Sequence, residues 1–260
     1  MLRTRALTAV VLLPIVITCI HLGGLWFLAM LAILLTVAEL EFCHLMARDD
    51  LRPVPAFGVG MVWLFLLVAH TQRLELLQPG MILIVLGSLT WQLFHRQGSP
   101  IADWALTVTG GLYLGLCGAC LIGLRLQAGS LWTLTTVLSI MFADSGAYFC
   151  GRAWGRHKLA PTISPGKTWE GYLAGIVIGG LLTTLLASLC RLGAVHGLIV
   201  GLLIATFAPL GDLAISMIKR HVGAKDSSNL IPGHGGALDR VDSILWAAAI
   251  GYYYVLLFIS

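Results

Sequence analysis

The feature that most constrains this chain is a series of long apolar windows that follow one another along its whole length. Each window has about the 20 residues that a helix needs to cross a hydrocarbon core about 30 Å thick. Nine such windows occur, at residues 6–22, 25–46, 54–70, 78–95, 104–124, 131–150, 172–190, 197–218 and 241–259. The pattern predicts an all-α, polytopic integral membrane protein with about nine transmembrane helices.

Composition supports this class, because 58% of the 260 residues are hydrophobic and only 11% are charged. A soluble domain carries roughly 25% charged residues and does not enclose so much apolar material in one core. We expect one continuous membrane domain, since nine helices leave room only for short loops. It comprises about five spans in residues 1–130, about four spans in residues 131–260, and cytoplasmic loops at residues 151–171 and 219–240.

The cationic residues fall almost entirely on one side of this layout. Arg73, Arg125 and Arg191 lie on one side, and the other thirteen Lys and Arg residues lie on the opposite side. Because Lys and Arg in short loops stay in the cytoplasm, the N-terminus and the basic loops are predicted to be cytoplasmic, and the C-terminus lies on the far side. The first window lacks a small-x-small cleavage site near residue 22 and is expected to be retained as a span.

Acidic residues in the second half of the chain concentrate at the predicted cytoplasmic ends of three spans. These acids are Asp144, Asp212, Asp239 and Asp242. Carboxylates that converge on one membrane face repel each other unless cations neutralise them, and a bound divalent metal does so economically. The alternative is that these acids only form ion pairs with the neighbouring residues Arg220, Lys225 and Arg240.

Two further acids, Glu39 and Glu41, lie near the cytoplasmic end of the window at residues 25–46. An acid inside a span is often functional, but an acid near the end of a helix also reaches the interface. The sequence leaves the role of both residues open.

The eighth window is interrupted by Pro209 and Gly211. Proline has no backbone N–H, so we expect the helix to break or kink near the middle of the membrane, beside a wet or protein-lined pocket. After the break, Asp212, Ser216 and Lys219 recur at intervals of four and three residues and share one helical face, with Arg220 adjoining.

The acids of the last window have a similar relation, because Asp239 and Asp242 are three residues apart and share a face. Two carboxylates so placed hold one hard cation or bridge two. The loop before them contains Lys225 and a glycine-rich stretch around His234, whose backbone N–H groups suit phosphate.

The other basic loop carries the cations Arg152, Arg156, Lys158 and Lys167, with Ser164 close to Lys167 in the sequence. Its Gly-Lys-Thr sequence does not form a nucleotide P-loop, because Pro161 stands where the first glycine is required and no strand context is evident. These cations suit phosphate groups, and an alternative reading is that they attract anionic lipid head groups.

The run from Ser216 to Asp242, SMIKRHVGAKDSSNLIPGHGGALDRVD, resembles the signature of the phosphatidate cytidylyltransferase (CDP-diacylglycerol synthase) family. The upstream segment ADSGAYFCGRAWGRHKLAPTISPGKTWEG is similar to that of bacterial members. Ala237 is one departure, since the family has a larger aliphatic residue at this position. The similarity is firm over residues 140–245 and general in the N-terminal half.

The resemblance implies transfer of CMP from CTP to phosphatidate, which gives CDP-diacylglycerol and pyrophosphate. It implies a bacterial inner-membrane enzyme that requires Mg²⁺, and the sequence leaves open whether a second cation binds beside it. It further implies CTP, phosphatidate and membrane lipids as partners, and no nucleic acid. Stripes of small residues, such as Gly175 with Gly179, are compatible with a homodimer.

The resemblance also implies roles for individual residues. The expected metal ligands are Asp212, Asp239 and Asp242, and the expected catalytic set adds Asp144 and Lys219. Phosphates of CTP or of the lipid are expected to meet Lys167, Lys219, Arg220 and Lys225, with hydrogen bonds from Ser164, Ser216 and His234. No protein nucleophile is needed, because the lipid phosphate itself attacks the α-phosphorus of CTP.

Two other functions remain open at this point. A CTP-dependent lipid kinase shares the membrane setting and the nucleotide but releases CDP. An ion-coupled transporter also uses broken helices with intramembrane acids, although here the combination of such acids with a broken-helix signal is confined to the last 120 residues and is not repeated earlier in the chain.

Overall fold

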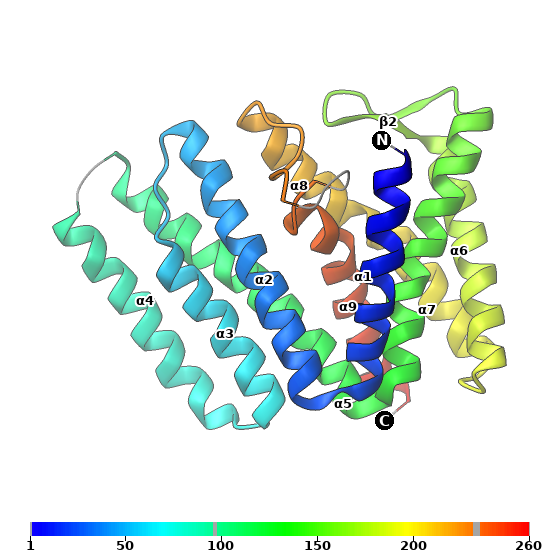
Figure 1. The fold of residues 1–260 in the computed structure, drawn as a ribbon, viewed down its shortest axis with the longest axis horizontal. Coiled ribbons are helices and arrows are strands. Elements are labelled where there is room, and N and C mark those ends of the chain that lie inside the picture. The colour runs from blue at the N-terminus through cyan, green and yellow to red at the C-terminus, as the bar shows by residue number, and fades with distance from the viewer. Residues whose placement is uncertain (1, 96–97, 231–234, 260) are drawn as a thin grey trace. The chain divides into compact units, whose positions relative to one another are not determined.

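A computed structural model describes residues 2–95, 98–230 and 235–259. Figure 1 traces its helices and strands in chain order. They are α1 (Leu2–Leu22), α2 (Gly24–Met46), η1 (Ala47–Asp49), α3 (Pro55–Thr71), η2 (Leu74–Leu76), α4 (Leu77–Phe94), α5 (Pro100–Trp154), β1 (Lys158–Ala160), β2 (Ser164–Thr168), α6 (Trp169–Leu189), α7 (Ala194–Phe207), α8 (Pro209–His221) and α9 (Leu238–Phe258).

The chain forms two compact units, which are described separately below. Unit 1 comprises Met1–Gly123 and His221–Val241, and unit 2 comprises Leu124–Arg220 and Asp242–Ser260. The sequence placed a division at residue 130. In the structure, the segment between α8 and α9 groups with the N-terminal helices.

The predicted class, an all-α polytopic membrane protein, is confirmed by the helices. Six segments of the described chain are long and apolar enough to cross a membrane, namely Gly24–Asp49, Leu74–Phe94, Pro100–Trp154, Trp169–Leu189, Ala194–His221 and Leu238–Phe258. Leu12–Leu22 and Pro55–Thr71 are shorter apolar segments. The count of nine spans stays a prediction.

The windows at residues 104–124 and 131–150 both lie in the 55-residue element α5. Its helical geometry is interrupted at Gly129, where φ is 78° and ψ is −174°. Only glycine adopts this region readily. Two helices therefore meet at Gly129, close to where the sequence separated the two windows.

The predicted interruption near Pro209 is present between α7 and α8. α7 ends at Phe207, α8 begins at Pro209, and Ala208 between them keeps helical torsions (φ −62°, ψ −32°). Gly211 N donates to Ala208 O at 2.9 Å, which is a tighter turn than that of an α-helix. The break is thus a local change in hydrogen bonding, as expected for a residue without an N–H.

A β-hairpin in the loop between α5 and α6 was not predicted. β1 and β2 pair antiparallel with Lys158 opposite Thr168 and Ala160 opposite Ser164, and the register shifts between Lys158 and Ala160. The strands have only three and five residues. Such short strands carry too little alternation of apolar and polar residues to be recognised from sequence.

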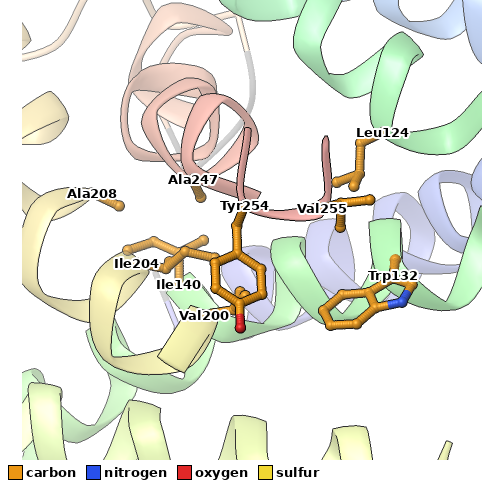
Figure 2. Packing of buried hydrophobic residues seen from close by; sticks show 9 residues of the cluster. All are labelled: Leu124, Trp132, Ile140, Val200, Ile204, Ala208, Ala247, Tyr254 and Val255. Atoms are coloured by element: carbon orange, nitrogen blue, oxygen red, sulfur yellow. The ribbon is translucent and has the colours of Figure 1, made fainter. Parts of the chain in front are cut away.

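The core of unit 2 is formed by residues from α5, α7 and α9. Figure 2 shows Tyr254 among Ile140, Val200 and Ile204, all of which are buried. The Tyr254 hydroxyl lies 2.9 Å from Nδ1 of His196, at the start of α7, so its polar end has a partner.

In unit 1, long-range contacts gather the chain segments that the sequence placed on the cytoplasmic side. Asp103 Oδ1, at the start of α5, accepts a hydrogen bond of 2.7 Å from the backbone N–H of Arg52. His221, at the end of α8, lies 3.2 Å from Asp49, just after α2. These segments therefore lie at one end of the helices of this unit.

Candidate active site

Unit 2 contains a cavity of about 630 Å³ at the end of α5 and the start of α6. Its charged and polar lining includes Asp144, Arg152, Lys158, Ser164, Lys167 and Asp212. Three of these side chains are cations and two are acids, so the lining has an excess of positive charge. The volume lies in the range of about 300–1,000 Å³ that is usual for small-molecule sites.

Small residues let α5 and α6 approach each other beside this cavity. A Cβ added to Gly175 would lie 2.8 Å from Ala143 O, and one added to Gly171 would lie 2.6 Å from Ala147 O. Both distances are too short for a side chain, so glycine is required for this packing. Thr168 Oγ1 caps α6 by accepting from Gly171 N at 3.2 Å.

The carboxylate of Asp212 lies at the cavity between two partners. Its Oδ2 is 2.7 Å from Lys167 Nζ, and its Oδ1 accepts a hydrogen bond of 3.1 Å from Ser216 Oγ. The second contact confirms that Asp212 and Ser216 share one helical face. Lys167 Nζ also reaches Pro209 O at 3.4 Å, so it marks the junction of α7 and α8.

The two cations that follow on α8 have different surroundings. Lys219 is 7% exposed and is largely enclosed by protein. Arg220 is exposed, and its Nε donates a hydrogen bond of 3.1 Å to Ile163 O in the hairpin turn. Arg220 was predicted to meet phosphate, and in the structure one of its N–H groups holds the hairpin.

Asp242 in unit 2 is 6% exposed and lies in the first turns of α9. Its Oδ1 accepts a 2.6 Å hydrogen bond from Ser243 N. Gly211 packs directly against the Asp242 carbonyl, and a Cβ added there would also lie 2.6 Å from Trp246 Cδ1. The start of α8, which carries Asp212, is therefore in contact with α9 at Asp242.

Asp239 in unit 1 binds the preceding loop through its carboxylate. Its Oδ2 accepts from Ser227 N at 2.9 Å, from Ser227 Oγ at 2.9 Å and from Gly236 N at 3.0 Å. Asp239 was predicted as a metal ligand, which stays a prediction, and in the structure its carboxylate binds the described parts of the loop.

Glu41 also binds this loop, although no role could be assigned to it from sequence. The side chain is 6% exposed, and it accepts hydrogen bonds from Ser227 Oγ, Ser228 Oγ, Ala237 N and Leu238 N. The only signal in the sequence was an acid inside an apolar window. Its partners, 186 to 197 residues away, are visible only in the fold.

The remaining predicted residues are placed as follows. Asp144 is exposed and Ser164 is half-buried, and both line the cavity of unit 2. Lys225 is exposed in the loop of unit 1. His234 lies outside the described residues.

The described residues do not show the set of ligands expected for the predicted metal site. Within the described part of either unit, no three His, Cys, Asp or Glu side chains are gathered as metal ligands. The assignment of Asp212, Asp239 and Asp242 to a metal stays a prediction.

A further contact that was not predicted from sequence, made by Glu170, holds the base of the hairpin. Glu170, in the first turn of α6, accepts from the backbone N–H groups of Arg156 and His157, at 3.1 Å and 3.2 Å. His157 Nδ1 lies 2.6 Å from Glu170 Oε1. Since Lys158 and Lys167 on this hairpin line the cavity, Glu170 fixes part of the cavity wall.

Comparison with known proteins adds a full-length similarity. Residues 3–258 match the model of a group described as the cytidylyltransferase family. A Bacillus subtilis (strain 168) protein named phosphatidate cytidylyltransferase is 32% identical over 268 residues, which cover 99% of this chain and 98% of that protein. A protein of the same name from Brucella suis biovar 1 is 36% identical over 271 residues, with coverage of 99% and 94%. Another, from Haemophilus influenzae, is 48% identical over 132 residues, or 46% of this chain and 44% of that protein.

Proposed function

Because the chain belongs to the cytidylyltransferase family, we propose that it transfers CMP from CTP to phosphatidate, giving CDP-diacylglycerol and pyrophosphate. The observation that carries this proposal is the similarity to phosphatidate cytidylyltransferases over nearly the whole chain. The cavity of unit 2, with its cationic lining, supports it by offering a site for phosphates.

The proposed reaction needs no nucleophile from the protein. An anionic phosphate oxygen of phosphatidate attacks the α-phosphorus of CTP, the bond from the α-phosphorus to the bridging oxygen breaks, and pyrophosphate leaves with that oxygen. The protein orients the two anions and neutralises their charge. Arg152, Lys158 and Lys167 are suited to this task, because all three line one cavity.

Lys167 contacts both the Asp212 carboxylate and the carbonyl oxygen of Pro209. Its ion pair with Asp212 leaves the side chains 26% and 35% exposed, and such pairs contribute about 1 kcal/mol or less to folding. The pair therefore has little value as a stabilising contact. We assign Lys167 to phosphate binding, with Asp212 orienting its ammonium group and Ser164 lining the same cavity.

Mg²⁺ is proposed as the cofactor on the chemistry of the donor atoms. Asp212 and Asp242 offer the carboxylate oxygens that hard cations prefer, on two helices that touch at Gly211. Asp239, the third ligand expected from sequence, lies in unit 1, where its Oδ2 already accepts three hydrogen bonds. Bound Mg²⁺ would supply positive charge to the reacting phosphates.

The membrane placement is also a proposal. We place the chain in a bacterial cytoplasmic membrane, with the N-terminus and the cavity on the cytoplasmic side. The support is the bias of thirteen Lys and Arg residues toward one side of the predicted layout.

The test is a direct assay of the purified protein in lipid nanodiscs, with α-labelled CTP, phosphatidate and Mg²⁺. We expect a labelled CDP-lipid and one pyrophosphate for each turnover, and loss of both products when EDTA removes the metal. Release of CDP without a nucleotide-linked lipid would indicate a lipid kinase. Absence of turnover by the folded protein would contradict cytidylyl transfer.

A further inference from the structure

We propose that Glu41 is a positioning residue that holds the two described ends of the loop between α8 and α9, around Ser228 and Ala237, in the conformation that the reaction requires. The inference rests on the proposed cytidylyltransferase function, because that loop contains Lys225 and much of the family motif. It assigns a role in the reaction to an acid of α2, far from the motif in the sequence.

The carboxylate of Glu41 accepts hydrogen bonds from two separate parts of the loop. Oε1 accepts from Ser228 Oγ at 2.6 Å and from Ala237 N at 3.0 Å. Oε2 accepts from Ser227 Oγ at 2.8 Å and from Leu238 N at 2.9 Å. Each oxygen thus joins one serine at the beginning of the loop to one backbone amide at its end.

The two backbone contacts also cap α9, which begins at Leu238. The first N–H groups of a helix have no partner within the helix, and a negative charge there is favourable. A residue just before the helix usually provides such a cap. Here Glu41 provides it from another helix, so the start of α9 is fixed to α2.

Asp239, in the first turn of α9, also accepts hydrogen bonds from the loop. It binds Ser227 N, Ser227 Oγ and Gly236 N through Oδ2. Ser227 is fully buried, and its single hydroxyl is shared by the two carboxylates. Two acids can lie this close because four backbone amides and the hydroxyls of Ser227 and Ser228 surround them.

The glycines of the loop fit closely around the two carboxylates. A Cβ added to Gly236 would overlap Ser227 Oγ and Glu41 Oε2. Gly235 has φ of 80°, and a Cβ added to it would lie 2.6 Å from Asp239 Oδ2. The Gly-Gly pair of the motif therefore has a physical reason, which is to let the backbone reach the two acids.

The direct test compares Glu41→Gln with Glu75→Gln, a matched change of an exposed acid in η2 of the same unit. A glutamine at residue 41 keeps one acceptor oxygen, but its NH₂ group faces a backbone N–H that cannot accept. We expect hydrogen exchange in peptides with Ala237 and Leu238 to become about tenfold faster, as for loss of a hydrogen bond to a charged group. Glu75→Gln should leave it unchanged.

The values of kcat and KM distinguish a positioning role of Glu41 from an effect on folding stability alone. A variant that only folds less well lowers the apparent kcat in proportion to the folded fraction and leaves KM unchanged. We expect Glu41→Gln to raise KM for CTP or phosphatidate about tenfold per folded enzyme. Glu41→Asp, which is shorter by one methylene, should give a smaller increase.

Unchanged exchange together with unchanged KM in Glu41→Gln would overturn the proposal. Should that variant not fold, Ser228→Ala removes one of the four hydrogen bonds and carries the same test, and wild-type KM and exchange there would equally overturn it. A wild-type protein without cytidylyl transfer would instead contradict the proposed function, while the exchange experiment would still test the fastening of the loop.

Discussion

Asp212 is an acid of the unit 2 cavity whose two carboxylate oxygens both have a partner. Lys167 and Ser216 occupy its two oxygens, so its orientation is fixed from β2 on one side and from its own helix on the other. The sequence predicted the relation to Ser216, because a spacing of four residues places two side chains on one face. It did not predict Lys167 as a partner, because that contact depends on how the hairpin folds.

We expect Asp212→Asn to lower kcat/KM by about 10²–10³-fold, the loss typical of removing one group that stabilises reacting charge. The change keeps the shape of the side chain but removes the charge that orients Lys167. Ser216→Ala is the matched control, since it removes a single hydrogen bond to the same carboxylate and should cost about tenfold or less. The measurement is CDP-lipid formation, and wild-type activity of Asp212→Asn at saturating Mg²⁺ would contradict the assignment.

Gly236 is tightly enclosed in the loop of unit 1, since a Cβ there would overlap Glu41 and Ser227. We expect Gly236→Ala to destabilise the protein by about 1–3 kcal/mol, as overpacking usually does. Gly60→Ala in α3 is the control, because a Cβ there meets only Ile84 Cδ1, at 3.9 Å. Thermal unfolding in detergent measures both variants, and equal Tm values would show that the loop yields without cost.

At the scale of elements, the helices were predictable and the contacts between them were not. A helix that crosses a membrane needs a long apolar run, and this requirement is readable in one dimension. Pro209 likewise indicated where the helix is interrupted, because a missing backbone N–H affects hydrogen bonding locally. The hairpin and the attachment of the loop by Glu41 depend on partners far apart in the chain, so periodicity carries no sign of them.

The hairpin of unit 2 allows a prediction at this scale. Glu170 accepts hydrogen bonds from two backbone N–H groups and from His157 where the chain enters β1. We expect Glu170→Gln to loosen this entry, so that limited proteolysis within residues 156–168 becomes faster and KM for CTP rises several-fold. The thermal stability of the helices should change little, because the contact is exposed.

Glu75→Gln again serves as the control, since Glu75 is an exposed acid of η2 and does not line the cavity of unit 2. Proteolysis of Glu170→Gln at the wild-type rate would show that the paired strands hold the hairpin without Glu170. A fall in kcat with unchanged KM would indicate that Glu170 does not shape the binding site for CTP.

At the scale of the whole molecule, the number of spans depends on which apolar segments cross the membrane. Six helical segments qualify by length and composition, and one of them, Pro100–Trp154, is interrupted at Gly129 and has enough residues for two passes. The two shorter apolar segments, Leu12–Leu22 and Pro55–Thr71, then decide the count. With both of them, the structure accommodates the nine spans that the sequence predicts.

An odd number of spans places the two termini on opposite sides of the membrane, and an even number places them on the same side. We expect alkaline phosphatase fused after Ser260 to be active and green fluorescent protein at the same position to be dark, because the positive-inside bias places the C-terminus outside the cytoplasm. Fusions within the loop at residues 156–162 should show the reverse pattern and serve as the control. A fluorescent C-terminal fusion would require an even count, and the bias of thirteen cations to one side would then need a different layout of spans.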